Sequence, residues 1–253
     1  GDLMLALHTG HGEFPRIILT PGSLEQAFEL TAAAFDFADR FQTPVIILTD
    51  QFLIDSYRTL SPFSTEKISW ERHIVRSGEH YQRYEVTGTG VSPRAVPGSG
   101  AGLVLADSDE HDEAGRITES MSMRSKMQDK RLRKYDEITE HAVPPDFFGG
   151  GDGSLLLAGW GSTRGVTLEV LDLLDRSDIR YMHLKQVWPL PKEARAALLS
   201  AKTVAVIEGN AEGQLAGLLQ RETGKKVDRR ILKYNGLQFY VEELYERLQE
   251  VIS

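Results

Sequence analysis

Apolar positions divide the chain into three stretches, and the first has the pattern of an α/β unit. Two short apolar runs, 16–20 and 44–50, flank a segment from Leu24 to Ala38 in which apolar side chains recur at helical spacing. Ser23 offers an N-cap for this helix, with Gln26 three residues later as its capping-box partner. Runs that are apolar along their whole length are typical of strands buried on both faces. The pattern therefore predicts a strand–helix–strand unit with a right-handed crossover.

The middle stretch, residues 61–150, has little apolar periodicity and many turn signals. These include Ser92-Pro93, Pro97-Gly98-Ser99-Gly100 and Gly149-Gly150-Gly151. One helix, rich in Arg, Lys and Met, is predicted from about Ile117 to His141. Structureless loops of this length are uncommon in compact domains and usually serve a function or are covered by a partner. We interpret 61–150 as a long excursion from the first domain together with a linker.

The third stretch returns to the α/β pattern, so we place a domain boundary at residue 150 and predict domains over 1–150 and 151–253. Apolar runs predict three strands, at 155–158, 179–184 and 204–208. Helical spacing predicts helices at 166–174, from Pro191 to Leu199, from about Gln214, and at 241–252.

Composition narrows the functional classes. The chain has 253 residues, 41% of them apolar, and a net charge of −8, which argues against a nucleic-acid binder because the phosphate backbone repels acidic surfaces. No apolar run reaches the ~18 residues of a membrane span. The absence of cysteine excludes disulfides, a thiol nucleophile and cluster ligands in this chain. The first residues show no secretory signal, so we expect a cytoplasmic protein, and the non-Met start suggests that upstream residues are missing.

Two loops carry possible ligand chemistry, but a simpler reading is favoured for each. The loop from Gly159 to Gly165 links a strand to a helix, where backbone amides can hold a phosphate. Its spacing is one residue longer than the dinucleotide fingerprint, so a plain tight turn is favoured. The acidic run from Asp107 to Glu113 lacks the glycine that a calcium loop requires at position six. A solvated acidic loop is favoured there over a metal site, and no metal ligand is assigned.

Two polar groups lie next to predicted strands. His11, Glu13 and Arg16 come just before the first strand and could form a cluster near a cofactor, although such groups are more often structural. The segment from Glu208 to Gln214 lies where a strand ends and a helix begins. Ligands and partners bind at the carboxyl ends of parallel strands, so this segment is a candidate edge without assigned chemistry.

Ordered motifs along residues 1 to about 220 resemble the alpha subunit of 2-oxoacid:ferredoxin oxidoreductases, and most of all the 2-oxoglutarate type. They are His11-Gly12-Glu13-Phe14-Pro15-Arg16, Pro21-Gly22-Ser23, Pro44-Val45-Ile46-Ile47-Leu48-Thr49-Asp50-Gln51, Tyr81-Gln82-Arg83-Tyr84, Gly90-Val91-Ser92-Pro93-Arg94, Pro97-Gly98, Asp107-Ser108-Asp109-Glu110-His111-Asp112-Glu113, Met127-Gln128-Asp129-Lys130-Arg131, Glu208-Gly209-Asn210 and Gly213-Gln214-Leu215.

The resemblance implies a fold and a reaction. It implies an α/β chain of two three-layer domains: the C-terminal part of a thiamine-diphosphate pyrimidine-binding domain, followed by a transketolase C-terminal-like domain. In this family, thiamine diphosphate forms a carbanion that attacks the 2-oxo carbon of the substrate, and carbon dioxide leaves. Electrons pass singly through iron–sulfur clusters to ferredoxin, and coenzyme A takes the acyl group.

The resemblance also implies how the work is divided between chains. Thiamine diphosphate and its magnesium would be shared with a beta subunit that carries a [4Fe-4S] cluster. Ferredoxin and a gamma subunit or domain would be further partners. The family's glutamate at the aminopyrimidine and its substrate-binding threonine and arginine precede the segment that matches Gly1. No catalytic residue is therefore assigned here, and we expect the isolated chain to bind none of these cofactors and to be inactive.

The resemblance places the cluster His11, Glu13 and Arg16 near the active-site entrance between subunits. Candidate interface residues are Arg94, Glu208, Asn210 and Gln214. Two alternatives to the enzyme subunit stay open at this point. One is a non-catalytic assembly fragment of such a complex, and the other is a nucleotide-binding dehydrogenase built on the Gly159 loop. The sequence leaves open the 2-oxo acid, the direction of the reaction and the oligomeric state.

Overall fold

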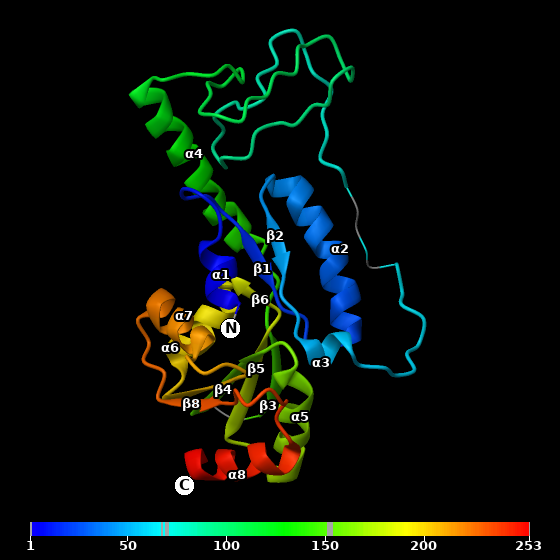
Figure 1. Ribbon diagram of the computed structural model, residues 1–253, viewed down its shortest axis with the longest axis vertical. Helices are drawn as coiled ribbons and strands as arrows, with labels where there is room; N and C mark the ends of the chain where they lie inside the picture. Colours follow the sequence, from blue (N-terminus) through cyan, green and yellow to red (C-terminus); the bar gives the residue numbers. More distant parts are fainter. Residues whose placement is uncertain (1, 67, 69–70, 151–153, 253) are drawn as a thin grey trace.

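The computed structural model describes residues 2–66, 68, 71–150 and 154–252 and shows two sheets with helices packed on them (Figure 1). The smaller sheet has the strand order β2-β1-β6 and the larger one the order β3-β5-β4-β7-β8. The predicted α/β class is confirmed. A short helix, α1 (Leu3–His8), comes before the first strand.

The first sheet contains the predicted strand–helix–strand unit. Strands β1 (Ile17–Leu19) and β2 (Val45–Ile47) are parallel, and α2 (Leu24–Phe41) connects them. The Oγ of Ser23 accepts a hydrogen bond from the backbone N of Gln26 at 3.2 Å, so the predicted cap forms. The apolar face of α2 packs on β1, and Ile138 from a later helix completes this small core.

The second sheet has four parallel strands and one antiparallel edge strand. The parallel strands are β4 (Leu155–Trp160), β5 (Ile179–Leu184), β7 (Thr203–Glu208) and β8 (Arg229–Leu232). Strand β3 (Asp146–Gly149) runs antiparallel to β5. The helices that belong to this sheet are α5 (Thr163–Leu174), α6 (Lys192–Ser200), α7 (Gln214–Thr223) and α8 (Val241–Ile252).

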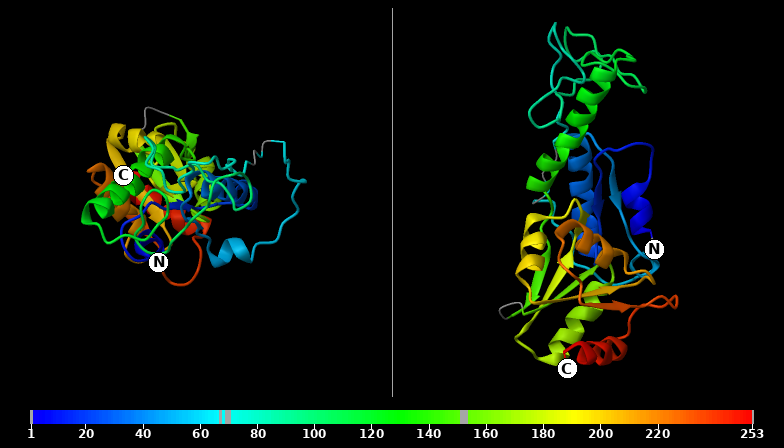
Figure 2. Two further views of the ribbon diagram at one scale, coloured as in Figure 1. Left: turned by 90° about the horizontal axis from the view of Figure 1, so that it is seen from above. Right: turned by 90° about the vertical axis from the view of Figure 1, so that its left-hand side faces the viewer.

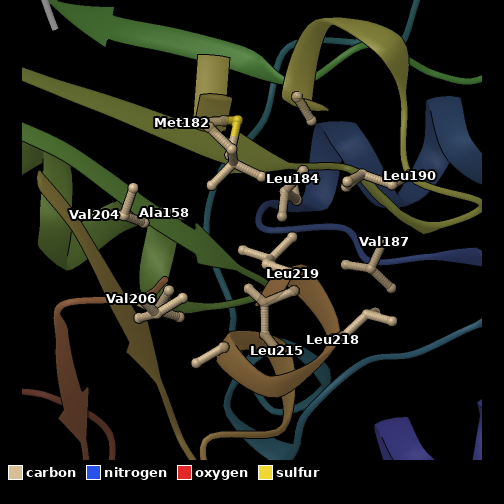
Figure 3. Packing of buried hydrophobic residues seen from close by; sticks show 14 of the residues in the cluster. Ala158, Met182, Leu184, Val187, Leu190, Val204, Val206, Leu215, Leu218 and Leu219 are labelled. Atoms are coloured by element: carbon tan, nitrogen blue, oxygen red, sulfur yellow. The ribbon is translucent and has the colours of Figure 1, made fainter. Parts of the chain in front are cut away.

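These helices cover both faces of the larger sheet and make it the middle of three layers. Ala158, Met182, Val204 and Val206 belong to the core that one face of the sheet shares with α6 and α7 (Figure 3). The side chains that alternate with them, among them Leu157, join the core shared with α5 and α8. The alternation follows from the period of two along a strand, because successive side chains point to opposite faces.

Each half of the chain contributes one strand to the sheet of the other half. Strand β3 lies before the predicted boundary at residue 150, yet it pairs in the larger sheet. Strand β6 (Gln186–Trp188) lies after that boundary and pairs antiparallel with β1. The boundary itself stays a prediction, and residues 151–153 fall outside the described part of the chain.

The excursion folds against one long helix. After the short helix α3 (Gln51–Ile54), the described backbone up to residue 120 contains turns and two isolated bridges, and α4 (Met121–Glu140) follows. The irregular segment covers the N-terminal part of α4 (Figure 2). Helix α4 begins at 121 and not at 117 because Ser120 accepts a cap bond from Met123 N, while Ile117 bridges to His111.

Ion pairs hold this segment in place. Glu110 pairs with Arg131 and, at 2.8 Å, with Arg124, while Glu113 pairs with Lys126 at 2.6 Å. Two carboxylates of the acidic run, Glu110 and Glu113, therefore hold it against α4, whereas a solvated loop was expected. None of the helices in the described residues is both long and apolar enough to cross a membrane.

Candidate functional site

The carboxyl ends of strands from both sheets meet at one cleft. Asp50 follows β2, Gly161 follows β4 and Asn210 follows β7, and all three line a cavity of about 280 Å³. The remaining lining residues are Asp2, Leu3, Leu48, Thr49, Gln51, Trp160, Thr163, Gly209 and Gln238. Ligands of open parallel sheets bind outside such strand ends, so this cleft is the candidate functional site.

A larger hollow of about 690 Å³ opens beside the cleft. It shares Asp50 and Asn210 with the smaller cavity and adds Glu212, Lys233 and Tyr234. Lys233 is buried and pairs with Glu243, and its ammonium lies 4.8 Å from the ring centroid of Tyr240. The combined wall presents polar and apolar surface in about equal shares.

Asp50 connects the two sheets at the floor of the cleft. Its Oδ1 accepts a hydrogen bond from Ser162 Oγ at 2.6 Å and another from Leu53 N at 2.9 Å. The carboxylate thus caps α3 and fixes the loop after β4. Since Ser162 is used in this way and Arg164 N bonds to Gly161 O, the Gly159–Gly165 loop has the contacts of a plain tight turn.

The sheets approach closely where Gly22 faces His183. A Cβ on Gly22 would collide with the His183 ring and with the carbonyl oxygen of Gly161. This is the physical reason for glycine in the Pro21-Gly22-Ser23 motif. Thr20 Oγ1 donates to Leu184 O at 2.7 Å, which pins the end of β1 to the end of β5.

His183 is completely buried at this junction. Its Nε2 lies 3.3 Å from Gly161 O, and its Nδ1 has no hydrogen-bond partner among the described residues. Burial lowers the pKa of His183 to about 4, so the imidazole is neutral at pH 7. Sequence reasoning missed this residue because nothing local distinguishes it from a core position.

Glu208, Asn210 and Gln214 lie together around the N-terminus of α7. Glu208 is fully buried and accepts hydrogen bonds from Leu215 N at 2.8 Å and Ala216 N at 3.0 Å. Asn210 donates to the same carboxylate and accepts from Gly213 N. Gln214 Oε1 accepts from Met4 N at 3.3 Å, which ties α1 to α7. These bonds cap the helix, and the interface role of the three residues stays a prediction.

His11, Glu13 and Arg16 do not pair with one another in the structure. Arg16 is 4% exposed, and its Nη1 donates to Ala6 O at 3.2 Å and Thr9 O at 2.5 Å. The guanidinium therefore caps the end of α1, a helix that the sequence analysis did not predict. Glu13 and Arg16 line a separate cavity of about 340 Å³, whereas His11 is exposed to solvent.

Arg94, the remaining candidate interface residue, forms an ion pair with Asp39 at 2.6 Å and donates to Arg72 O at 2.9 Å. It fastens the excursion to α2. Its role toward a partner chain stays a prediction. The part of the chain that the structure describes contains no group of three or more His, Cys, Asp or Glu side chains arranged to hold a metal ion.

Comparison with known proteins gives the family. Residues 1–130 match the family model described as "Pyruvate flavodoxin/ferredoxin oxidoreductase, thiamine diP-bdg". This chain belongs to the pyruvate flavodoxin/ferredoxin oxidoreductase family. The resemblance to 2-oxoacid:ferredoxin oxidoreductase alpha subunits is thereby confirmed, and so is the implied thiamine-binding α/β fold.

Relatives of this family member are oxidoreductase subunits. The chain is 34% identical over 261 aligned positions to the alpha subunit of 2-oxoacid:ferredoxin oxidoreductase 1 from Sulfurisphaera tokodaii, covering 100% of the chain and 41% of that protein. It is 28% identical to the 2-oxoglutarate synthase subunit KorA of Archaeoglobus fulgidus, covering 87% of the chain and 57% of that subunit. The chain thus spans about two fifths of the length of the former relative.

A solved structure matches the whole chain of this family member. It is the 2-oxoglutarate:ferredoxin oxidoreductase from Magnetococcus marinus with 2-oxoglutarate, coenzyme A and succinyl-CoA bound. The TM-score is 0.91 and the identity 31%, over 100% of this chain and 45% of that one.

Proposed function

We propose that this chain is part of the alpha subunit of a thiamine-diphosphate-dependent 2-oxoglutarate:ferredoxin oxidoreductase. The observation that carries the proposal is the fold match over the entire chain to an enzyme with 2-oxoglutarate, coenzyme A and succinyl-CoA bound. The reaction would be oxidative decarboxylation of the 2-oxo acid to its acyl-CoA, with the electrons passed to ferredoxin.

The proposal divides the thiamine diphosphate site between two chains, as the family resemblance implies. Magnesium at a diphosphate is usually held by one or two carboxylates together with the phosphate oxygens. Asp50, the carboxylate at the end of β2, is already bound to Ser162 and to the start of α3. We therefore assign the diphosphate, the magnesium and a [4Fe-4S] cluster to a beta subunit, and derive no chemical step from this chain's own residues.

The role proposed for this chain is to provide a surface on which the other subunits of the complex pack. Polar strand ends of both sheets face one cleft, where a beta subunit, ferredoxin or a gamma subunit or domain could dock. The alternative of a non-catalytic assembly fragment would use the same surface.

The test is reconstitution. The alpha subunit that contains this chain, purified with its beta subunit, should reduce ferredoxin in the presence of 2-oxoglutarate and coenzyme A. The 253-residue chain alone should show neither activity nor micromolar affinity for thiamine diphosphate and magnesium in calorimetry. Absence of 2-oxoglutarate-dependent reduction in the complex would contradict the substrate assignment. Low-micromolar binding of thiamine diphosphate by the chain alone would contradict the assignment of the diphosphate and magnesium to a beta subunit.

A further inference from the structure

Three cationic side chains gather between the excursion and helix α4. Lys130 is 6% exposed, and its ammonium lies 5.7 Å from the ring centroid of Tyr84. The Arg83 guanidinium lies 4.9 Å from the same centroid, so both cations share one aromatic ring. Lys134 follows Lys130 by four residues on α4, which places both on one face of the helix.

Gly90 closes the excursion over these lysines. Its φ is +79°, and a Cβ at this position would collide with the carbonyl oxygen of Lys130 and lie 3.2 Å from Lys134 N. The backbone therefore rests directly on the helix between the two lysines. Lys134 Nζ donates to Gln42 O at 3.1 Å, and Arg133 donates to Thr87 O at 2.8 Å.

One nearby carboxylate, Glu113, attracts the Lys130 ammonium, but it forms its ion pair with Lys126. Glu113 accepts from Lys126 and from Val86 N, and Glu110 is paired with Arg124 and Arg131. Within the described ranges, no carboxylate forms an ion pair with the three clustered cations. The Nη1 of Arg83 is buried and has no hydrogen-bond partner there either. Buried charged donors normally have partners, so this arrangement is costly without a ligand.

Electrostatics support the same conclusion. Burial, followed by the charges of Arg83 and Arg131, lowers the pKa of Lys130 to about 8. Burial, followed by the charges of Lys130, Arg83 and Arg131, lowers the pKa of Lys134 to about 8. An anion among these groups would reverse the charge repulsion and favour both ammonium forms.

We propose that Arg83, Lys130 and Lys134 form a binding site for an oxyanion, a phosphate or carboxylate group of a small molecule. The planar fork of an arginine matches two oxygens of such a group, and two ammonium groups can bind the remaining ones as point charges. The Tyr84 ring lies beside two of these cations and also packs against His111, with 3.7 Å between the ring centroids. Three of the motifs that carried the family resemblance contribute to it, through Arg83, Gly90 and Lys130.

Thermal unfolding of the 253-residue chain tests the site directly. Inorganic phosphate and succinate are each compared with sodium chloride at equal ionic strength. At about ten times its dissociation constant, a specific anion should raise the Tm by about 3 °C. Arg83→Gln should lose most of that rise. Arg124→Gln, which removes an exposed cation of the same helix outside the cluster, should keep it.

The two anions distinguish a phosphate ligand from a carboxylate ligand. A rise with phosphate alone assigns a phosphate group, and a rise with succinate alone assigns a carboxylate; both support the site. No rise beyond chloride, or an equal rise in wild type and Arg83→Gln, would overturn it.

A second measurement remains decisive if Arg83→Gln fails to fold. In a titration of the lysine Cε signals of the wild-type chain, the bound anion should move the pKa values of Lys130 and Lys134 upward, toward the ordinary value of about 10.4. Unchanged pKa values would refute the proposal. Neither experiment requires the oxidoreductase activity, so its outcome is independent of the proposed function.

Discussion

The buried cap of α7 gives the sharpest stability prediction. In Glu208→Gln the side chain keeps its shape, but one carboxylate oxygen becomes an NH₂ group. In the wild-type chain, Oε1 of Glu208 accepts a hydrogen bond from Ala216 N, and Oε2 accepts from Leu215 N and Asn210 Nδ2. Whichever way the amide is oriented, at least one buried N–H of the chain then faces another donor.

The expected loss follows from the bonds involved. A hydrogen bond to a charged group contributes about 1.5–3 kcal/mol, and an anion at a helix N-terminus adds about 0.3–1 kcal/mol. Relief of the carboxylate's desolvation offsets part of this. We expect a net loss of about 3 kcal/mol in the free energy of unfolding, which corresponds to about 9 °C in Tm for a chain of this size.

Urea and thermal unfolding at pH 7 provide the measurement. Glu212→Gln is the matched control, because Glu212 is exposed in the same loop and accepts a single bond from Gln214 Nε2. The control should stay within about 0.5 kcal/mol of wild type. If Glu208→Gln lost less than about 1 kcal/mol, the carboxylate would not be the main cap of α7, and Asn210 would have to suffice.

Two further predictions concern buried side chains. Arg16→Ala should lower the unfolding free energy of the isolated chain by about 2–3 kcal/mol, because two carbonyl groups at the end of α1 lose their donor. The control, Arg124→Ala, should change the unfolding free energy by less than about 0.5 kcal/mol. Equal effects of the two substitutions would contradict the capping role of Arg16. For His183, the folded pKa of about 4 lies below the unfolded value of 6.5, so the unfolded state binds more protons between these pH values. The contribution of His183 to the free energy of unfolding should be complete above pH 6.5 and fall by about 3 kcal/mol toward pH 4. The fall should be smaller in His183→Gln. Identical pH profiles of wild type and His183→Gln in urea unfolding would refute this.

The sequence was most informative where elements are long and strongly apolar. The strand at 179–184 and the helix at 241–252 occupy the predicted residues. The elements that were missed are short: α1, α3, β3, β6 and β8 have three to six residues each, as their bounds show. Such segments form through tertiary contacts, and local propensity alone does not reveal them.

The candidate site shows the same dependence on tertiary contacts. Glu208, Asn210 and Gln214 could be grouped from sequence because one strand end and one helix start hold them together. Arg16 was grouped with Glu13 because α1, the element that actually uses its guanidinium, was not predicted. The cluster around Arg83 was missed because it depends on how Gly90 brings the excursion onto α4.

The exchange of edge strands between the two halves limits how the chain can be divided. A cut at residue 150 would leave the N-terminal fragment with β3 but without β6, and the C-terminal fragment with the reverse. Each fragment would then carry one orphan strand and one exposed sheet edge, a combination that promotes aggregation. The two halves should therefore be expressed, and should unfold, as a single unit.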